Sequence, residues 1–168
     1  MGSAIAGECL SHAAQAERAY DIPAGLIQAI AQVESGGTGV PNPLALAVGR
    51  RSLRPTSQEQ AVRLLRSRPA KGVFVGCMQL SLRHHQAAFG DTEAMLDPAV
   101  NVDYGARLLV HLQVASGSWV RAVQLYQGGK PAAQRRYACK IAAALRQTNP
   151  DTAEQIDFGR CPRRLADS

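Results

Sequence analysis

The sequence predicts a single α+β domain that is mainly helical and carries a short β-hairpin insertion. Aromatic residues make up only 5% of the 168 residues, while Ala and Leu are abundant, a composition that favours helices over a β-sandwich or barrel. Apolar residues recur at helical spacing in most segments, and one stretch alone alternates with a period of two. With 46% hydrophobic residues, a chain of this length can bury one core.

The chain is basic, with a formal net charge of +6. This charge predicts an anionic partner: a nucleic acid, an anionic membrane surface or the acidic polymer of a bacterial wall. The basic residues are not interleaved with aromatic residues and no helix-turn-helix or RNA-binding motif occurs, which disfavours nucleic acid. No apolar run approaches the length of a membrane span. Residues 1–3 look like a cloning scar in front of Ala4, so we expect that a secretory signal was removed.

Two helices are predicted first, over residues 8–20 and 23–34. Asp21 stands where an N-cap would lie, and Pro23 suits a first helical turn. Gly36 and Gly37 provide the end of the second helix. Glu34 is therefore expected near the negative pole of its own helix.

Glu34 is the candidate catalytic residue. A carboxyl at the C-terminal end of a helix and beside apolar residues is harder to ionise than a free one, as a general acid must be. On this helix alone, an exposed terminal glutamate is the simpler interpretation. The motifs described below favour the catalytic one.

The middle of the chain predicts a small sheet and a helix. Leu44, Leu46 and Val48 alternate with small residues, which indicates a strand, and Leu53 falls on its return partner. Thr56 with Glu59, or Ser57 with Gln60, offers a capping box for a helix that ends near residue 67. An extended run over residues 73–75 completes the sheet, and residues 84–89 predict one or two helical turns.

The rest of the chain predicts three helices and a tail. Asp97 and Pro98 begin a long helix to about residue 115, and further helices are expected over residues 119–127 and from Pro131 to about Leu145. Residues 149–168 are polar and predict an irregular C-terminal tail. Neither an internal repeat nor a linker is recognised, so residues 1–168 are expected to form one domain.

Four cysteines, Cys9, Cys77, Cys139 and Cys161, are candidates for disulfides. Their even number suits an oxidising compartment, and three pairings are possible. A bond between Cys139 and Cys161 would pin the tail to the preceding helix and leave Cys9 with Cys77; four reduced, buried cysteines remain the alternative. The cysteines form no CxxC pair, and Cys77 with His84 and His85 lacks the spacing of a structural zinc site, so neither metal nor cofactor is expected.

Four motifs occur in a suggestive order: Glu34-Ser35-Gly36-Gly37, Gly76-Cys77-Met78-Gln79-Leu80, residues 101–106 and residues 119–129. Together they resemble the soluble lytic transglycosylase family, whose pattern is Glu-Ser, Gly-Leu-Met-Gln, Asn-x-x-x-Gly and Ala-Tyr-Asn-x-Gly. The resemblance runs from about residue 9 to 145. It implies a lysozyme-like domain that cleaves peptidoglycan glycan strands.

The resemblance also implies a mechanism that uses one carboxyl. Glu34 would protonate the oxygen between MurNAc and GlcNAc, and then accept the proton of the MurNAc C6 hydroxyl as a 1,6-anhydro ring closes. The same resemblance marks as substrate-binding the residues Ser35, Gly76, Met78, Gln79, Tyr126 and Gln127. Core or turn roles are the alternatives for Met78 and Tyr126. Two positions depart from the family, Gln127 in place of asparagine and Cys77 in place of leucine.

The closer likeness is to small, periplasmic, secreted members that accompany flagella or type III and type IV secretion machines. We expect a monomer that acts on peptidoglycan, with a flagellar or secretion protein as a possible partner. Two alternatives stay open. One is a lysozyme-type hydrolase, which needs a second carboxylate such as Asp97 or Asp103. The other is a wall-binding or scaffold module, in which a basic set holds anionic polymer, namely Arg50, Arg51, Arg63 and Arg66.

Overall fold

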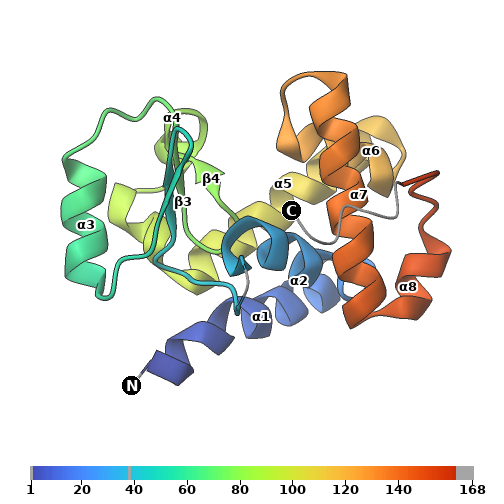
Figure 1. Cartoon of the computed structure of the whole chain (residues 1–168), viewed down its shortest axis with the longest axis horizontal. Coiled ribbons are helices and arrows are strands. Elements are labelled where there is room, and N and C mark those ends of the chain that lie inside the picture. Colours follow the sequence, from blue (N-terminus) through green and yellow to red (C-terminus); the bar gives the residue numbers. More distant parts are fainter. Residues whose placement is uncertain (1, 38, 162–168) are drawn as a thin grey trace.

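The computed structural model describes residues 2–37 and 39–161, with side chains from residue 7 onward. Met1 of the suspected cloning scar and residues 162–168 of the predicted tail lie outside the described residues. Figure 1 shows the sheet, α3 and α4 together at one end of the molecule and α6, α7 and α8 at the other end. Helices α1, α2 and α5 lie between these two groups. The predicted mainly helical α+β class is confirmed. The helices are α1 (Gly2–Ala19), α2 (Leu26–Ala31), α3 (Gln58–Arg66), α4 (Leu82–His85), α5 (Pro98–Ser116), α6 (Trp119–Gln127), α7 (Pro131–Thr148) and α8 (Pro150–Gln155).

The start of α2 differs from the prediction. The helix begins at Leu26 rather than Pro23, and Asp21 has a φ of 53° and does not cap it. The cap comes from another helix: the Glu17 carboxylate of α1 accepts hydrogen bonds from the backbone N–H groups of Gly25, at 2.8 Å, and Gln28, at 3.0 Å. A carboxylate is favoured at the positive pole of a helix, which explains why Glu17 is buried.

The sheet has four antiparallel strands in the order β2-β1-β3-β4. They span β1 (Leu46–Val48), β2 (Arg51–Leu53), β3 (Val73–Val75) and β4 (Leu80–Ser81). The predicted hairpin is confirmed, since Leu46 pairs with Leu53 in the β1–β2 register and with Val75 in the β1–β3 register. The fourth strand was not predicted, because two residues are too few to show a periodicity.

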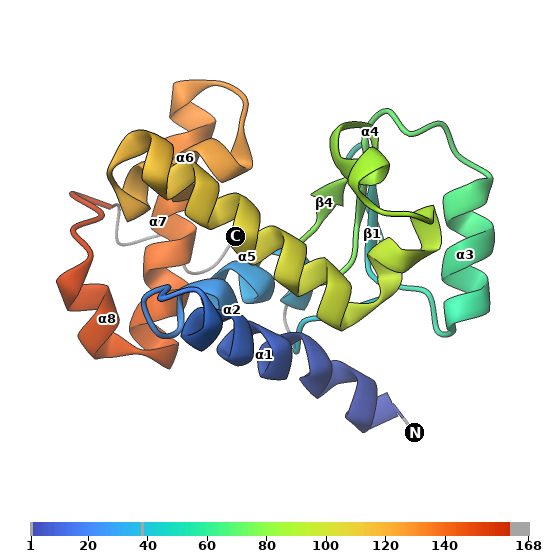
Figure 2. The same cartoon turned by 180° about the vertical axis from the view of Figure 1, so that it is seen from behind.

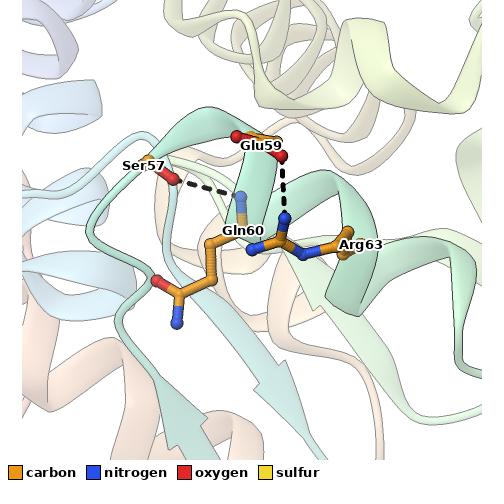
Figure 3. A network of polar contacts seen from close by, with 4 residues as sticks. All are labelled: Ser57, Glu59, Gln60 and Arg63. Atoms are coloured by element: carbon orange, nitrogen blue, oxygen red, sulfur yellow. Dashed lines mark hydrogen bonds and ion pairs between the residues drawn. The ribbon is translucent and has the colours of Figure 1, made fainter.

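Helix α3 begins with the second of the two predicted capping arrangements. Figure 3 shows the Ser57 hydroxyl accepting a hydrogen bond from the Gln60 N–H, at 3.2 Å. Glu59 and Arg63 form an ion pair along the helix, at 2.8 Å. Two exposed side chains contribute only a few tenths of a kcal/mol, so the cap and the apolar face fix this helix.

The long helix α5 has the predicted start, with the Asp97 carboxylate accepting from the N–H groups of Ala99 and Val100. Figure 2 shows α5 running from the sheet side of the molecule towards α6. The buried face of α5 supplies Val102, Ala106 and Leu109 to the core. Helix α5 therefore extends the hydrophobic core from the elements around the sheet to those around α6.

The tail is more ordered than predicted. Residues 150–155 form α8, which the Asn149 side chain caps by accepting from the Thr152 N–H at 3.1 Å. The irregular-tail prediction is wrong there, because Asn149 and Pro150 together make a helix start that composition alone conceals. Among the described helices, none has the length and apolar character needed to cross a membrane.

Both disulfides are present. Cys9 of α1 is bonded to Cys77 in the turn between β3 and β4, and Cys139 of α7 is bonded to Cys161. The reduced alternative and the other two pairings are therefore excluded in this structure. Of the two bonds, only the first reaches the motif that follows β3.

Candidate active site

Glu34 lies in a π-helical turn, η1 (Gln32–Gly36), that continues α2. A π-turn is rare and often marks a functional site, because it turns a side chain away from the face that an α-helix would give it. Two contacts hold the turn. The Ser35 hydroxyl donates to the Cys77 carbonyl at 2.9 Å, and the Arg54 guanidinium donates to the carbonyls of Ser35 and Gly36, both at 3.0 Å. The hydrogen bonds of Ser35 and Arg54 thus fix the backbone of the turn that carries Glu34.

The partner of the Glu34 carboxyl is Tyr137, on α7. Its hydroxyl donates to Glu34 Oε1 at 2.5 Å. Glu34 also lines a pocket. Helix α7 therefore contributes directly to the site, although no predicted catalytic or substrate-binding residue lies on it.

The pKa of Glu34 suits a general acid. Burial raises the pKa from its ordinary value of 4.5 to about 7, against the opposing effect of the Tyr137 hydrogen bond, which lowers it. Burial also raises the pKa values of the Tyr126 and Tyr137 phenols, and the nearby Glu34 charge adds to this. Both phenols therefore stay protonated and act as hydrogen-bond donors at neutral pH.

A pocket of about 330 Å³ opens at Glu34. Its walls come from the β1–β2 hairpin, from β3 and the turn after it, and from the end of α6. The lining residues are Glu34, Ala47, Gly49, Arg50, Arg51, Ser52, Phe74, Gln79, Tyr126 and Gln127. Among the described residues that line the pocket, Glu34 is the one carboxylic acid.

The predicted turn over residues 76–79 is built around Asn101 of α5, which is completely buried. Its side-chain amide donates to the carbonyls of Val75, at 3.0 Å, and Met95, at 2.8 Å, and accepts from the Met78 N–H at 2.9 Å. Gly76 has a φ of 81°, and a Cβ there would lie 2.5 Å from Asn101 Nδ2. Gly76 is therefore required for the close approach of Asn101, and it is absent from the pocket lining.

Two of the predicted substrate-binding residues have buried side chains. The Met78 side chain is fully buried and lies against Gly105 of α5, where a Cβ would come within 2.9 Å of it. Ser35 is also buried, with its hydroxyl committed to backbone carbonyls. Their side chains pack and position the site, which is the role that a family motif alone does not distinguish from substrate binding.

The remaining predicted residues reach the pocket. Gln79 has a φ of 45°, unusual for a residue other than glycine, and its amide nitrogen donates to the carbonyls of Ala45 and Gly76. The oxygen of the same Gln79 side-chain amide can act as a hydrogen-bond acceptor. Gln127 is exposed at the end of α6. Tyr126 lines the pocket, but its hydroxyl donates to the Met78 carbonyl at 2.8 Å rather than to Glu34.

The two candidates for a second catalytic carboxylate have other partners. Asp97 caps α5. Asp103 accepts from the Tyr20 hydroxyl, at 2.5 Å, and forms an ion pair with Arg107, at 2.9 Å. Neither aspartate lines the pocket.

Sequence reasoning assigned no site role to Tyr137, Asn101 or Arg54, although Asn101 begins the third of the four motifs. Tyr137 falls on the apolar face of its helix, where a core role is the default interpretation, and Arg54 belongs to none of the motifs. Asn101 had a usable signal, because a polar residue on the buried face of an apolar helix needs specific partners.

A family model described as the transglycosylase SLT domain matches residues 11–143. A search of curated proteins and a search of solved structures each gave no match. Domains of this family are lytic transglycosylases that act on peptidoglycan, outside the cytoplasm. The matched region contains the whole of the Glu34 pocket, and by this match the chain belongs to the transglycosylase SLT domain family.

Proposed function

We propose that this protein is a lytic transglycosylase in which Glu34 is both the general acid and the general base. The observation that carries the proposal is the half-buried Glu34 carboxyl, which lines the pocket, accepts a hydrogen bond from the Tyr137 hydroxyl and has a pKa raised to about 7. A group with this pKa is protonated often enough to act as an acid near neutral pH, and it can then act as a base.

In the first step, the Glu34 proton passes to the glycosidic oxygen between MurNAc and GlcNAc, and the bond from that oxygen to MurNAc C1 breaks. In the second step, the MurNAc C6 oxygen bonds to C1 and its proton passes to the Glu34 carboxylate. Water is not consumed and the enzyme is regenerated. The internal hydroxyl has a high effective concentration, so the reaction needs no second carboxylate to activate water.

Three pocket residues would hold the sugar. The side-chain amide oxygen of Gln79 can accept from an acetamido N–H or a hydroxyl, and Gln127 offers a second amide in the pocket lining. Tyr126 contributes an aromatic face while its hydroxyl supports the turn. Gln127 has one methylene group more than the family asparagine, so its amide stands further from the backbone.

The decisive experiment is a digest of purified peptidoglycan sacculi, read by mass spectrometry. The wild type should release anhydro-muropeptides, and Glu34→Gln should fold and release none. Glu154→Gln, an exposed carboxyl on α8, is the matched control and should behave as the wild type does. Products heavier by one water would instead identify a hydrolase. Binding to sacculi without product would identify a wall-binding module.

We also propose a periplasmic location and a role in opening the wall for a flagellum or a secretion apparatus. The two disulfides support an oxidising compartment, and the resemblance to small secretion-associated enzymes supports the role. Fractionated cells should contain the protein in the periplasm with all four thiols resistant to alkylation. Deleting its gene should reduce flagellation or secretion without slowing growth, and the Glu34→Gln gene should fail to restore it.

A further inference from the structure

Arg50 and Arg51 stand at the tip of the β1–β2 hairpin, where both line the candidate pocket. Gly49 and Arg50 form the connection between Val48 and Arg51, which are register partners. The Gly49 N–H donates to the Gly72 carbonyl at 2.9 Å and fastens the tip to the segment before β3. The backbone that carries the two guanidinium groups is therefore held at the mouth of the pocket.

These two arginines differ from the other two of the basic set. Both are exposed, and neither forms an ion pair with any residue that the structure describes. Arg63 and Arg66, by contrast, each have a glutamate partner. The uncompensated positive charge of the set is thus concentrated at the pocket.

The sheet face beside the arginines is shaped for a sugar ring. Phe74 pairs with Ala47 across β1 and β3, and Ala47 pairs with Ser52 across β1 and β2. All three line the pocket, and Phe74 is 39% exposed despite its central position in the sheet. Small side chains beside an exposed ring make a shelf for an apolar sugar face, and the arginines lie at the edge of that shelf.

When Glu34 is protonated, the charged groups among the described residues that line the pocket are the guanidinium groups of Arg50 and Arg51. Guanidinium groups bind carboxylates through paired, charge-assisted hydrogen bonds. In peptidoglycan the free carboxylates belong to the stem peptide that each MurNAc carries, since the lactyl carboxyl is used in the peptide link. The charge and the shelf together suit a sugar that bears an acidic peptide.

We propose that Arg50 and Arg51 bind the stem-peptide carboxylates of the glycan strand and make the protein select charged, peptide-bearing strands. This inference rests on the proposed function. It assigns to the hairpin tip a specificity that is separate from the chemistry at Glu34.

The test compares two forms of the same soluble, uncross-linked glycan strands. In both forms the peptide amines are acetylated, and in one form the peptide carboxyls are also converted to methylamides. The wild type should cleave the charged strands with a kcat/KM about tenfold higher than the amidated ones, a modest factor because the arginines are exposed. Arg50→Gln with Arg51→Gln should reduce this preference to near unity.

The matched control is Arg18→Gln with Arg146→Gln, two exposed arginines outside the pocket. It removes the same charge and should keep the tenfold preference. The proposal is overturned if the hairpin variant keeps the wild-type preference, or if the control loses it to the same extent. The second result would mean that net charge alone attracts the strands.

Binding provides a readout that does not depend on turnover. Glu34→Gln should be retained more strongly by immobilised charged strands than by amidated ones, and adding the two hairpin substitutions should abolish the difference. If the wild type cleaves neither strand, the proposed function fails, and the retention measurement still decides the role of Arg50 and Arg51. Equal retention of Glu34→Gln on both strands would refute that role.

Discussion

Two opposing effects set the acidity of the Glu34 carboxyl: burial raises its pKa, and the hydrogen bond from Tyr137 lowers it. Since the acid form must protonate the leaving oxygen, kcat/KM should fall as the pH rises through about 7. Tyr137→Phe removes the lowering effect, so the basic limb of the pH profile should move to higher pH, by roughly half a unit to one unit.

Tyr126→Phe is the control for that shift, because the Tyr126 hydroxyl binds the Met78 carbonyl and not the carboxyl. Its basic limb should stay at the wild-type pH, whatever happens to the rate. The measurement is the kcat/KM of each variant on soluble glycan strands between pH 5 and 9. A Tyr137→Phe limb at the wild-type position, or at lower pH, would contradict the assignment of Tyr137.

The raised pKa of Glu34 also has a consequence for stability. Between pH 4.5 and about 7 the folded state binds more protons at Glu34 than the unfolded state does, so stability falls as the pH rises through this window. Glu34→Gln stays neutral at every pH and should therefore be more stable than the wild type at pH 8, by up to about 3 kcal/mol.

Urea unfolding of both proteins at pH 4 and pH 8 measures this effect, since other titrating groups cancel in the comparison. At pH 4 the two free energies of unfolding should agree within about 1 kcal/mol. Glu154→Gln, an exposed carboxyl on α8, is the matched control and should change the free energy of unfolding by less than about 0.5 kcal/mol. A variant less stable than the wild type at pH 8 would mean that the carboxylate is stabilised in the folded state.

The two disulfides join different elements and should have different effects on activity. Cys77 belongs to the turn that Asn101 holds, and its carbonyl accepts a hydrogen bond from the hydroxyl of Ser35, the residue after Glu34. The other bond joins α7 to Cys161, and neither of its cysteines lines the pocket. Replacing Cys9 and Cys77 by serine should therefore lower kcat severalfold and cost about 4 kcal/mol of stability, as expected for a long loop.

Replacing Cys139 and Cys161 by serine is the matched variant. The loop is shorter, so about 3 kcal/mol of stability should be lost, and kcat should stay within a factor of about two below the melting temperature. Thermal melts and single-turnover rates at 25 °C separate the two quantities. Equal effects of the two variants on kcat would contradict a positioning role for the Cys9–Cys77 bond.

Element starts were predictable where the cap was local in sequence. Asp97 with Pro98 and Ser57 with Gln60 mark helix starts within a few residues, and both were found. The start of α2 was missed because its cap, Glu17, comes from a different helix. The two-residue strand β4 is fixed by pairing with β3 rather than by any pattern of its own.

At the scale of the whole molecule, features that depend on local sequence were likewise predictable, and features that depend on tertiary contacts were not. Periodicity and motif order were enough to predict the fold class, which the structure confirms, and to propose Glu34, because both depend on short stretches of sequence. The partner of Glu34 was not, because Tyr137 lies 103 residues away and reaches the carboxyl only after α7 packs beside α2 and η1. The burial of Met78 likewise depends on Gly105 of α5, which no local pattern reveals.

The net charge of +6 belongs to the molecule as a whole, and its effect should be visible in wall binding. Attraction between exposed charges is screened over about 10 Å at 0.1 M salt and over about 30 Å at 0.01 M. Retention of Glu34→Gln on intact sacculi should therefore fall as salt rises between these concentrations, as measured by pelleting. Adding Arg18→Gln with Arg146→Gln should weaken this salt dependence slightly, because the pair removes two positive charges outside the pocket. Adding Arg50→Gln with Arg51→Gln should weaken it more, because this pair removes the same charge and also the proposed contacts to the peptide carboxylates. Equal slopes for the two variants would mean that net charge alone accounts for the attraction to the wall.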